Sequence, residues 1–269
     1  MISNIAHRGA RSLAPENTLA AAEKACQAGA DLWETDVRVS RDQTLILFHD
    51  LYPGRTTNAD QIFPGRHQDT VSDFSLAEIR RLDAGTFFEK SDPFGTIRTG
   101  EVSRVELSSY RGQPVPTLEE GLQLTTDLDW KINLELKDLP ESMRDFLLVD
   151  RVLAVVEQSA FPCEKLVISS FNHHWLRQVQ RSRPEIEVQA LIGSSRIGPL
   201  DWGGYEFPVY NARCTLISAN QILLARERGV KVNLFTVNDP EEMRRFITAG
   251  VSGLITDYPQ RLSRILQYT

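Results

Sequence analysis

Five side chains that could carry chemistry stand at or near the ends of short apolar segments: His7, Glu34, Asp36, His49 and Glu135. Glu34 and Asp36 are two residues apart, so on an extended strand both carboxylates face the same side. With Glu135 they offer the oxygen ligands that hard cations prefer, and we expect them to bind one divalent cation, Mg²⁺ or Ca²⁺. The imidazoles of the two histidines titrate near ~6.5 when unperturbed, which suits general acid and base work at neutral pH.

Two basic residues accompany these groups. Arg8 directly follows His7, and Lys137 stands two residues beyond Glu135, on the same face of the predicted strand. They could neutralise the inward carboxylates, because an unpaired buried charge is very costly. They could also hold phosphate oxygens, Arg8 through its planar fork and Lys137 as a point charge. A purely structural network of salt bridges is the alternative interpretation of the same residues.

The segments that must position these residues alternate between short apolar runs and amphipathic helical patterns. Capping boxes at Ser75 and Thr117, and Asp239 followed by Pro240, indicate helix starts between the runs. Strands alternating with helices over 269 residues favour a single α/β domain with its active site at the carboxyl ends of the strands. This periodicity alone is compatible with a closed barrel and with an open doubly wound sheet. We predict eight strands, at residues 2–6, 30–37, 45–48, 132–136, 166–169, 188–192, 230–237 and 253–256.

Two regions interrupt the alternation. Residues 38–44 are too few to hold the crossover helix that two parallel strands would need, so this link is locally unusual. Residues 51–116, after the third predicted strand, are polar and rich in Gly, Pro and Thr. We interpret this stretch as an elaborated insertion of the kind that often covers a site.

The composition excludes several classes of partner. With 41% hydrophobic residues the chain can bury a large core, and its net charge of −6 disfavours nucleic acid or an anionic membrane surface. The longest apolar run, residues 152–156, is far shorter than the roughly 20 residues of a membrane span, so we expect no stable membrane anchoring. No export signal is readable at the N-terminus, which predicts a cytoplasmic protein. The oligomeric state is left open.

The candidate site residues belong to a series of short motifs that follow one another in a fixed order. The series resembles the motifs of the glycerophosphodiester phosphodiesterase family from residue 5 to about 262. Single tripeptides are weak signals, whereas the complete ordered set is specific. The motifs are His7-Arg8-Gly9, Pro15-Glu16-Asn17-Thr18, Gly29-Ala30-Asp31 with Glu34 and Asp36, His49-Asp50, Leu82-Asp83-Ala84-Gly85, Pro116-Thr117-Leu118-Glu119-Glu120, Leu134-Glu135-Leu136-Lys137, Ser170-Phe171, Thr236-Val237-Asn238 and Thr256-Asp257-Tyr258-Pro259.

This resemblance implies a TIM-type (β/α)8 barrel, a divalent cation, and hydrolysis of glycerophosphodiesters such as glycerophosphocholine or glycerophosphoethanolamine. The products would be sn-glycerol 3-phosphate and an alcohol. It assigns acid-base catalysis to His7 and His49, and phosphate contacts to Arg8 and Lys137. It assigns metal binding to Glu34, Asp36 and Glu135. Which histidine is the acid, and whether water or a substrate hydroxyl is the nucleophile, stays open.

The chain departs from the family pattern in places. Phe235 stands where the family usually has tryptophan, and residues 205–218 match poorly, which leaves the head group undetermined. Phe171 and Phe235 could line a substrate wall, although core packing is nearly as good an interpretation. Glu16 is interpreted as a helix-start acid, with a pair to Arg8 or a place behind the metal ligands as the alternative. Asn17 is interpreted as a helix cap, and Asp257 as a ligand of a loop or of Lys137.

Two other functions compete with the first. Phenylalanines in the insertion could present a channel for the acyl chain of a lysophospholipid, but they are scattered among polar residues. A non-catalytic binder of phosphate ligands could use the same barrel. Such a binder would be expected to lack a histidine or a carboxylate of the set, and all of them are present.

Overall fold

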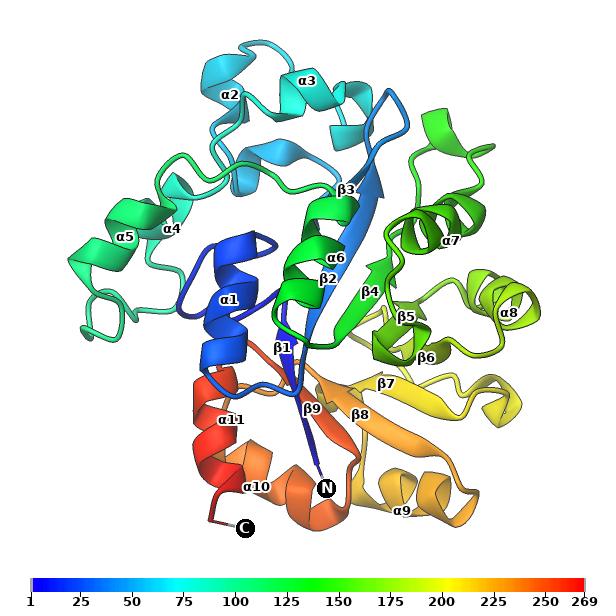
Figure 1. Cartoon of the computed structure of the whole chain (residues 1–269). Helices are drawn as coiled ribbons and strands as arrows, with labels where there is room; N and C mark the ends of the chain where they lie inside the picture. The colour runs from blue at the N-terminus through cyan, green and yellow to red at the C-terminus, as the bar shows by residue number, and fades with distance from the viewer. Residues whose placement is uncertain (1, 269) are drawn as a thin grey trace.

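Eight parallel strands close into a barrel in a computed structural model that describes residues 2–268 (Figure 1). Each strand pairs with the next along the barrel, and pairing of the last strand with the first closes it. The α/β barrel predicted from the sequence is therefore confirmed. The eight strands are β1 (Ser3–His7), β2 (Leu32–Val39), β4 (Ile132–Leu136), β5 (Leu166–Ser170), β6 (Glu187–Ile192), β7 (Val209–Arg213), β8 (Lys231–Phe235) and β9 (Gly253–Thr256).

The third predicted strand is not part of the barrel. It exists as β3 (Leu45–Leu47), but it pairs antiparallel with β2 as a hairpin, with Val37 opposite Leu47. The short link before it permits this pairing, since antiparallel strands need no crossover helix. The eighth barrel strand is instead β7, whose sequence VYNAR mixes apolar residues with Asn211 and Arg213 and forms no long apolar run. The sequence prediction missed β7 for that reason.

Seven helices surround the barrel: α1 (Leu19–Gln27), α6 (Leu118–Asp127), α7 (Leu148–Gln158), α8 (His173–Ser182), α9 (Ala219–Glu227), α10 (Pro240–Ala249) and α11 (Pro259–Leu266). The predicted capping box at Thr117 starts α6, and the Asp239 carboxylate accepts bonds from two backbone amides at the start of α10. The cap predicted at Asn17 is wrong: the hydroxyl of Thr18 caps α1, which leaves the side chain of Asn17 available elsewhere. The β6–β7 connection contains only a 3-10 turn at Gly203–Tyr205.

Residues 51–116 carry four short helices, α2 (Ala59–Ile62), α3 (Leu76–Ile79), α4 (Thr86–Ser91) and α5 (Arg104–Tyr110), and 3-10 turns at Pro53–Arg55 and Val71–Asp73. Figure 1 shows α2 and α3 near the β2–β3 hairpin, and α4 and α5 beside α1. Each half has a small apolar cluster: Phe74 packs with Ile46 of β3, and Phe88 packs with Ala21 of α1. The insertion is thus anchored to the barrel at two places. Further 3-10 turns are Glu141–Met143, Cys163–Lys165 and Cys214–Leu216.

The main apolar core lies between the strands and the surrounding helices and joins elements from both ends of the chain. Inside the barrel, polar side chains replace part of the usual branched apolar filling. Asn233 donates hydrogen bonds to Asn211 and Gln189, at 2.9 and 3.3 Å. Within residues 2–268, no helix has the length and apolar character needed to cross a membrane.

Candidate active site

The turn that ends β1 places His7 and Arg8 at the mouth of the barrel. Arg8 and Gly9 both adopt left-handed conformations, with φ of 57° and 79°. A Cβ atom on Gly9 would lie 2.5 Å from the carbonyl carbon of Ala21, so only glycine fits this turn. The turn directs the backbone N–H of Arg8 to Glu34, whose Oε2 accepts it at 2.9 Å. A tripeptide that is weak as a sequence signal thus has a specific structural role.

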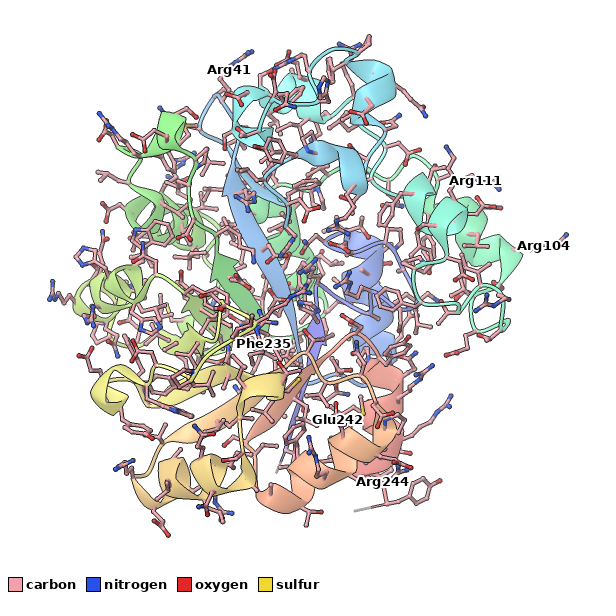
Figure 2. The ribbon with its side chains drawn as sticks, turned by 180° about the vertical axis from the view of Figure 1, so that it is seen from behind. Arg41, Arg104, Arg111, Phe235, Glu242 and Arg244 are labelled. Atoms are coloured by element: carbon pink, nitrogen blue, oxygen red, sulfur yellow. The ribbon has the colours of Figure 1, made fainter. Side chains whose placement is uncertain are left out.

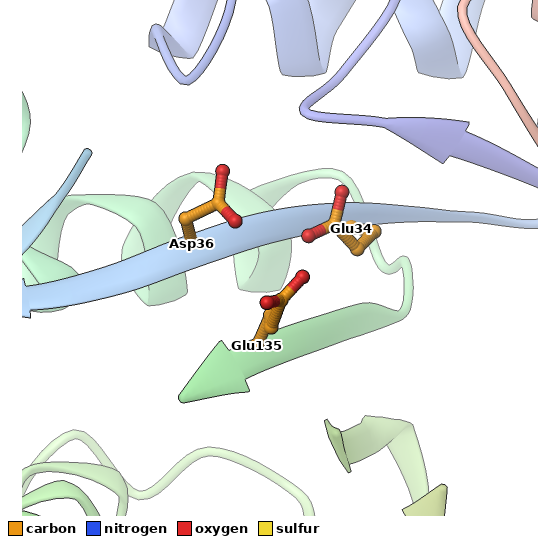
Figure 3. A group of neighbouring side chains, drawn as sticks. All are labelled: Glu34, Asp36 and Glu135. Atoms are coloured by element: carbon orange, nitrogen blue, oxygen red, sulfur yellow. The ribbon is translucent and has the colours of Figure 1, made fainter. Parts of the chain in front are cut away.

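Three carboxylates converge beside this turn. Glu34 and Asp36 extend from β2, and Glu135 extends from the neighbouring β4 (Figure 3). The strand register places Asp36 opposite Glu135, and one oxygen from each carboxylate lies within 4.8 Å of the others. Their side chains come from buried residues, which are 3%, 1% and 9% exposed respectively. The two-residue spacing and the parallel pairing together produce the cluster expected from the sequence.

Two cations partly neutralise the three carboxylates. Lys137 Nζ contacts Glu135 Oε1 at 2.5 Å and Asp36 Oδ1 at 3.0 Å, and Arg8 Nε lies 3.3 Å from Asp36 Oδ2. One negative charge remains in excess, and the buried Oε1 atom of Glu34 has no hydrogen-bond partner. A hard cation would satisfy both deficits. The acidic cluster is therefore able to bind a divalent metal ion.

The pKa values of Glu34 and Asp36 diverge because their neighbours differ. Burial, together with repulsion from Asp36 and Glu135, raises the pKa of Glu34 well above its ordinary value. Burial also opposes ionisation of Asp36, but attraction to Lys137 and Arg8 outweighs it and holds the pKa of Asp36 well below the ordinary value. Without a cation, Glu34 is the carboxyl group that favours its protonated form.

His7 is held by a carboxylate from the far end of the chain. Its Nδ1 lies 2.7 Å from Asp257 Oδ1, and Asp257 also accepts a bond from Asn238 Nδ2 at 2.6 Å. Partial burial and the nearby charge of Arg8 lower the pKa of His7 to about 4, although Asp257 opposes the shift. Burial disfavours ionised Asp257, but His7 and Arg11 overcome this and lower its pKa to about 2. Asp257 therefore binds His7, and not the loop or Lys137 that its place in the sequence suggests.

His49 has a similar arrangement after β3. Its Nδ1 lies 2.6 Å from Asp50 Oδ1, and Asp50 in turn binds the guanidinium of Arg55. Hydrogen bonds from His49 and Arg55 outweigh the effect of burial and lower the pKa of Asp50. Both candidate histidines therefore have Nδ1 engaged by an acid, which leaves Nε2 available for proton transfer.

Glu16 binds three arginines at this end of the barrel and is more than an acid at a helix start. Although only 8% exposed, it binds Arg8 and Arg11 at 2.7 Å each and also binds Arg55. It thereby connects the turn of His7 with the segment that supports His49. Asn17, freed from capping, donates a 2.8 Å bond to Asp36 Oδ2.

A cavity of about 280 Å³ joins these groups. Of the predicted site residues, only Asp36 does not line it, and Asp36 lies behind Lys137 and Arg8. Phe171 and Phe235 form part of the wall, with their rings in edge contact at 6.0 Å. Figure 2 places Phe235 near the centre of the molecule. Five further polar residues of the wall were not predicted from the sequence, namely Asn133, Ser169, Arg196, Asn211 and Arg213.

Both the sequence and the fold of this chain are similar to those of known proteins. The sequence profile described as the glycerophosphoryl diester phosphodiesterase family matches residues 7–261. A glycerophosphodiester phosphodiesterase of Caldanaerobacter subterraneus subsp. tengcongensis is 33% identical, over 98% of this chain and 97% of that protein.

Two solved structures share the fold over nearly the whole chain. A Silicibacter pomeroyi protein has a TM-score of 0.83 at 27% identity, covering 100% of this chain and 94% of that one. A phosphodiesterase of Oleispira antarctica, solved in complex with its product sn-glycerol-3-phosphate, has a TM-score of 0.79 at 26% identity. It covers 98% of this chain and 96% of that one.

Proposed function

We propose that this chain catalyses a metal-dependent reaction that releases sn-glycerol 3-phosphate. The chain belongs to the glycerophosphoryl diester phosphodiesterase family and is a phosphoric diester hydrolase. The substrates we propose are glycerophosphodiesters, including glycerophosphocholine and glycerophosphoethanolamine. The observation that carries the proposal is one cavity lined by His7, His49, Glu34 and Glu135, with Asp36 completing the acidic cluster behind its wall. We retain a single barrel domain and a cytoplasmic location as predictions.

The acidic cluster would hold the cation. Glu34, Asp36 and Glu135 supply hard oxygen ligands, and the unpartnered Oε1 of Glu34 supports this fit. Mg²⁺ and Ca²⁺ are both compatible with an all-oxygen set. Such a cation, when bound, would polarise a phosphoryl oxygen and neutralise developing charge.

Arg8 and Lys137 would hold the reacting phosphate beside the cluster. Both line the cavity, and their ion pairs with the carboxylates fix their positions before substrate binds. Fixed cations next to the phosphoryl oxygens stabilise charge that grows in the transition state, without the reorganisation that water would require. These two side chains would therefore orient the phosphate of the substrate.

The two histidines would divide the proton transfers. Each has Nδ1 bound to an acid, so the available atom is Nε2. One Nε2 accepts the proton of the nucleophile, and the other donates a proton to the oxygen of the leaving alcohol. Asp257 and Asp50 keep the rings in the orientation that this exchange needs.

A lysophospholipid is the weaker candidate substrate. The wall contains Phe171 and Phe235, but charged and amide side chains make up much of the remaining lining. A cavity of about 280 Å³ with this lining favours a small polar diester over an acyl chain.

Activity on defined substrates tests the proposal. Purified protein incubated with glycerophosphoethanolamine and Mg²⁺ or Ca²⁺ should form glycerol 3-phosphate, and His49→Ala should lower kcat by at least about 100-fold. The matched control is His174→Ala, because His174 is an exposed residue of α8 and does not line the cavity. Absence of product with several head groups and both metals would contradict the proposal.

A further inference from the structure

Two arginines line the cavity on the side that the proposed reaction does not use. Arg213 ends β7, and Arg196 belongs to the loop that follows β6. Neither guanidinium has a carboxylate within ion-pair distance among residues 2–268, in contrast to Arg8, Arg11 and Arg55, which all bind acids. Unpaired cations in a cavity indicate a binding partner that carries negative charge.

The position of Arg213 is fixed by its neighbours. Its Nε donates a 2.5 Å bond to the carbonyl of Gly193, and its guanidinium lies over the ring of Phe235 at 5.1 Å. Strand register sets Arg213 beside Phe235, which contacts Phe171 in turn. The side chain is therefore held against the cavity wall by groups that leave its positive charge uncompensated.

The strand order places this charge away from the reacting centre. The acidic cluster stands on β2 and β4, and going round the barrel three strands, β5, β6 and β7, follow β4. β7 thus lies across the barrel from β2. A diester whose phosphate lies at the acidic cluster would extend one of its two arms toward Arg213 and Arg196.

A buried amide adds a second polar group to the same wall. Asn211 precedes Arg213 by two residues on β7, so both side chains face the cavity. Asn211 is fully buried, and its Nδ2 has no hydrogen-bond partner, although its Oδ1 accepts a bond from Asn233. A free donor deep in the wall is a further site for an acceptor oxygen of a bound ligand.

We infer that Arg213 and Arg196 form a head-group subsite that selects glycerophosphodiesters whose leaving alcohol carries a second anionic group, a carboxylate or a phosphate. This inference rests on the proposed function and specifies its substrate class. A glycerol arm is uncharged and would gain little from two cations. A cationic arm such as choline would bind less favourably beside them, so we expect glycerophosphocholine to be a poorer substrate than an anionic diester.

Paired substrates that differ by one anionic group test the inference. Glycerophosphoserine differs from glycerophosphoethanolamine by a carboxylate, and glycerophosphoglycerol phosphate differs from glycerophosphoglycerol by a phosphate. In at least one pair we expect kcat/KM to favour the anionic member by about tenfold, the size of one charge-assisted hydrogen bond. The pair that shows the larger ratio identifies the anion. Raising the salt concentration should reduce the ratio.

Arg213→Gln and Arg196→Gln should each lower this ratio of kcat/KM values. We expect each variant to lose more kcat/KM on the anionic substrate than on the matched substrate without the anionic group. The matched control is Arg228→Gln, because exposed Arg228 also lies over an aromatic ring, that of Tyr205, but does not line the cavity. Its ratio should stay unchanged. Because Arg196 is exposed, its substitution tests the subsite even if the Arg213 variant folds poorly.

Two results would overturn the inference. If wild-type protein gave a kcat/KM ratio of one or less in both pairs, the proposed subsite would be wrong, while the proposed hydrolysis would still stand. An equal loss on both substrates in the Arg213 variant would reduce Arg213 to a support for the loop at Gly193. Failure of the proposed function itself would look different, since no diester of any head group would then be hydrolysed.

Discussion

His7 Nδ1 and Asp257 Oδ1 lie 2.7 Å apart, although the two residues are separated by 250 positions in the sequence. They meet because β1 and β9 are neighbours where the barrel closes. The orientation of a candidate catalytic imidazole therefore depends on closure of the barrel. An ionised Asp257 favours the tautomer with the proton on Nδ1, which leaves Nε2 for proton transfer in the proposed reaction.

Asp257→Asn should lower kcat by roughly 10- to 100-fold with a much smaller change in KM. The amide can still contact the ring, but it does not favour the same tautomer or stabilise the protonated imidazole. Steady-state kinetics on glycerophosphoethanolamine measures the change. Asp127→Asn, at an exposed position of α6, is the matched control and should behave as wild type. Unchanged kcat in the Asp257 variant would show that His7 does not depend on it.

Divalent cations should raise the thermal stability of the protein. Ligand at a hundred times Kd stabilises the folded state by about 2.7 kcal/mol, and scanning calorimetry with Mg²⁺ or Ca²⁺ measures the shift in Tm. Glu34→Gln should abolish most of this shift. The same variant should unfold no more easily than wild type without metal, because burial and repulsion from Asp36 and Glu135 already favour the neutral form of Glu34, which the glutamine amide resembles.

The control for the metal experiment is Glu157→Gln, at an exposed position near the end of α7. It should keep the full cation-dependent shift. A shift that survives in the Glu34 variant would place the cation elsewhere.

Protonation of His7 should destabilise the fold in mild acid. Its pKa of about 4 in the folded protein lies below the ordinary 6.5, so the unfolded chain takes up the proton first. The unfolding free energy therefore falls as pH drops from about 6.5 towards 4, and the stabilisation is complete above that window. Urea titrations in metal-free buffer at several pH values measure the slope. His7→Gln should show a shallower slope than wild type, and an equal slope would contradict the prediction.

A substrate with a good leaving group should separate the roles of the two histidines. A p-nitrophenyl ester of glycerol 3-phosphate needs little protonation of its leaving oxygen. The variant that lacks the general acid should therefore recover most of its activity, whereas the variant that lacks the base should not. Comparing His7→Ala with His49→Ala on both substrates decides which is which. Rescue of both variants, or of neither, would contradict a divided acid-base pair.

Much of the site could be predicted because its determinants are local. The two-residue spacing of Glu34 and Asp36 fixes their common face on β2, and the parallel register then brings in Glu135. His7 is the last residue of β1 and His49 stands two residues beyond β3, and the sequence shows the apolar residues of both strands. Such features depend on periods of a few residues, which a single sequence displays.

The features that were missed depend on partners far apart in the sequence or on mixed polarity. Asp257 reaches His7 only through barrel closure, and no local pattern shows it. β7 escaped prediction because Asn211 and Arg213 face the cavity and interrupt its apolar character. Arg213, one of these two polar residues, also belongs to the proposed head-group subsite. The polar side chains that give such a strand a role in binding also interrupt its apolar pattern, and the strand is therefore difficult to predict.

A crystal structure of the protein with a divalent cation and sn-glycerol 3-phosphate tests the proposed site most directly. We expect one cation bound by Glu34, Asp36 and Glu135, and the phosphorus between the Nε2 atoms of His7 and His49. A cation bound away from these carboxylates, or a phosphate that neither histidine contacts, would contradict the proposed site.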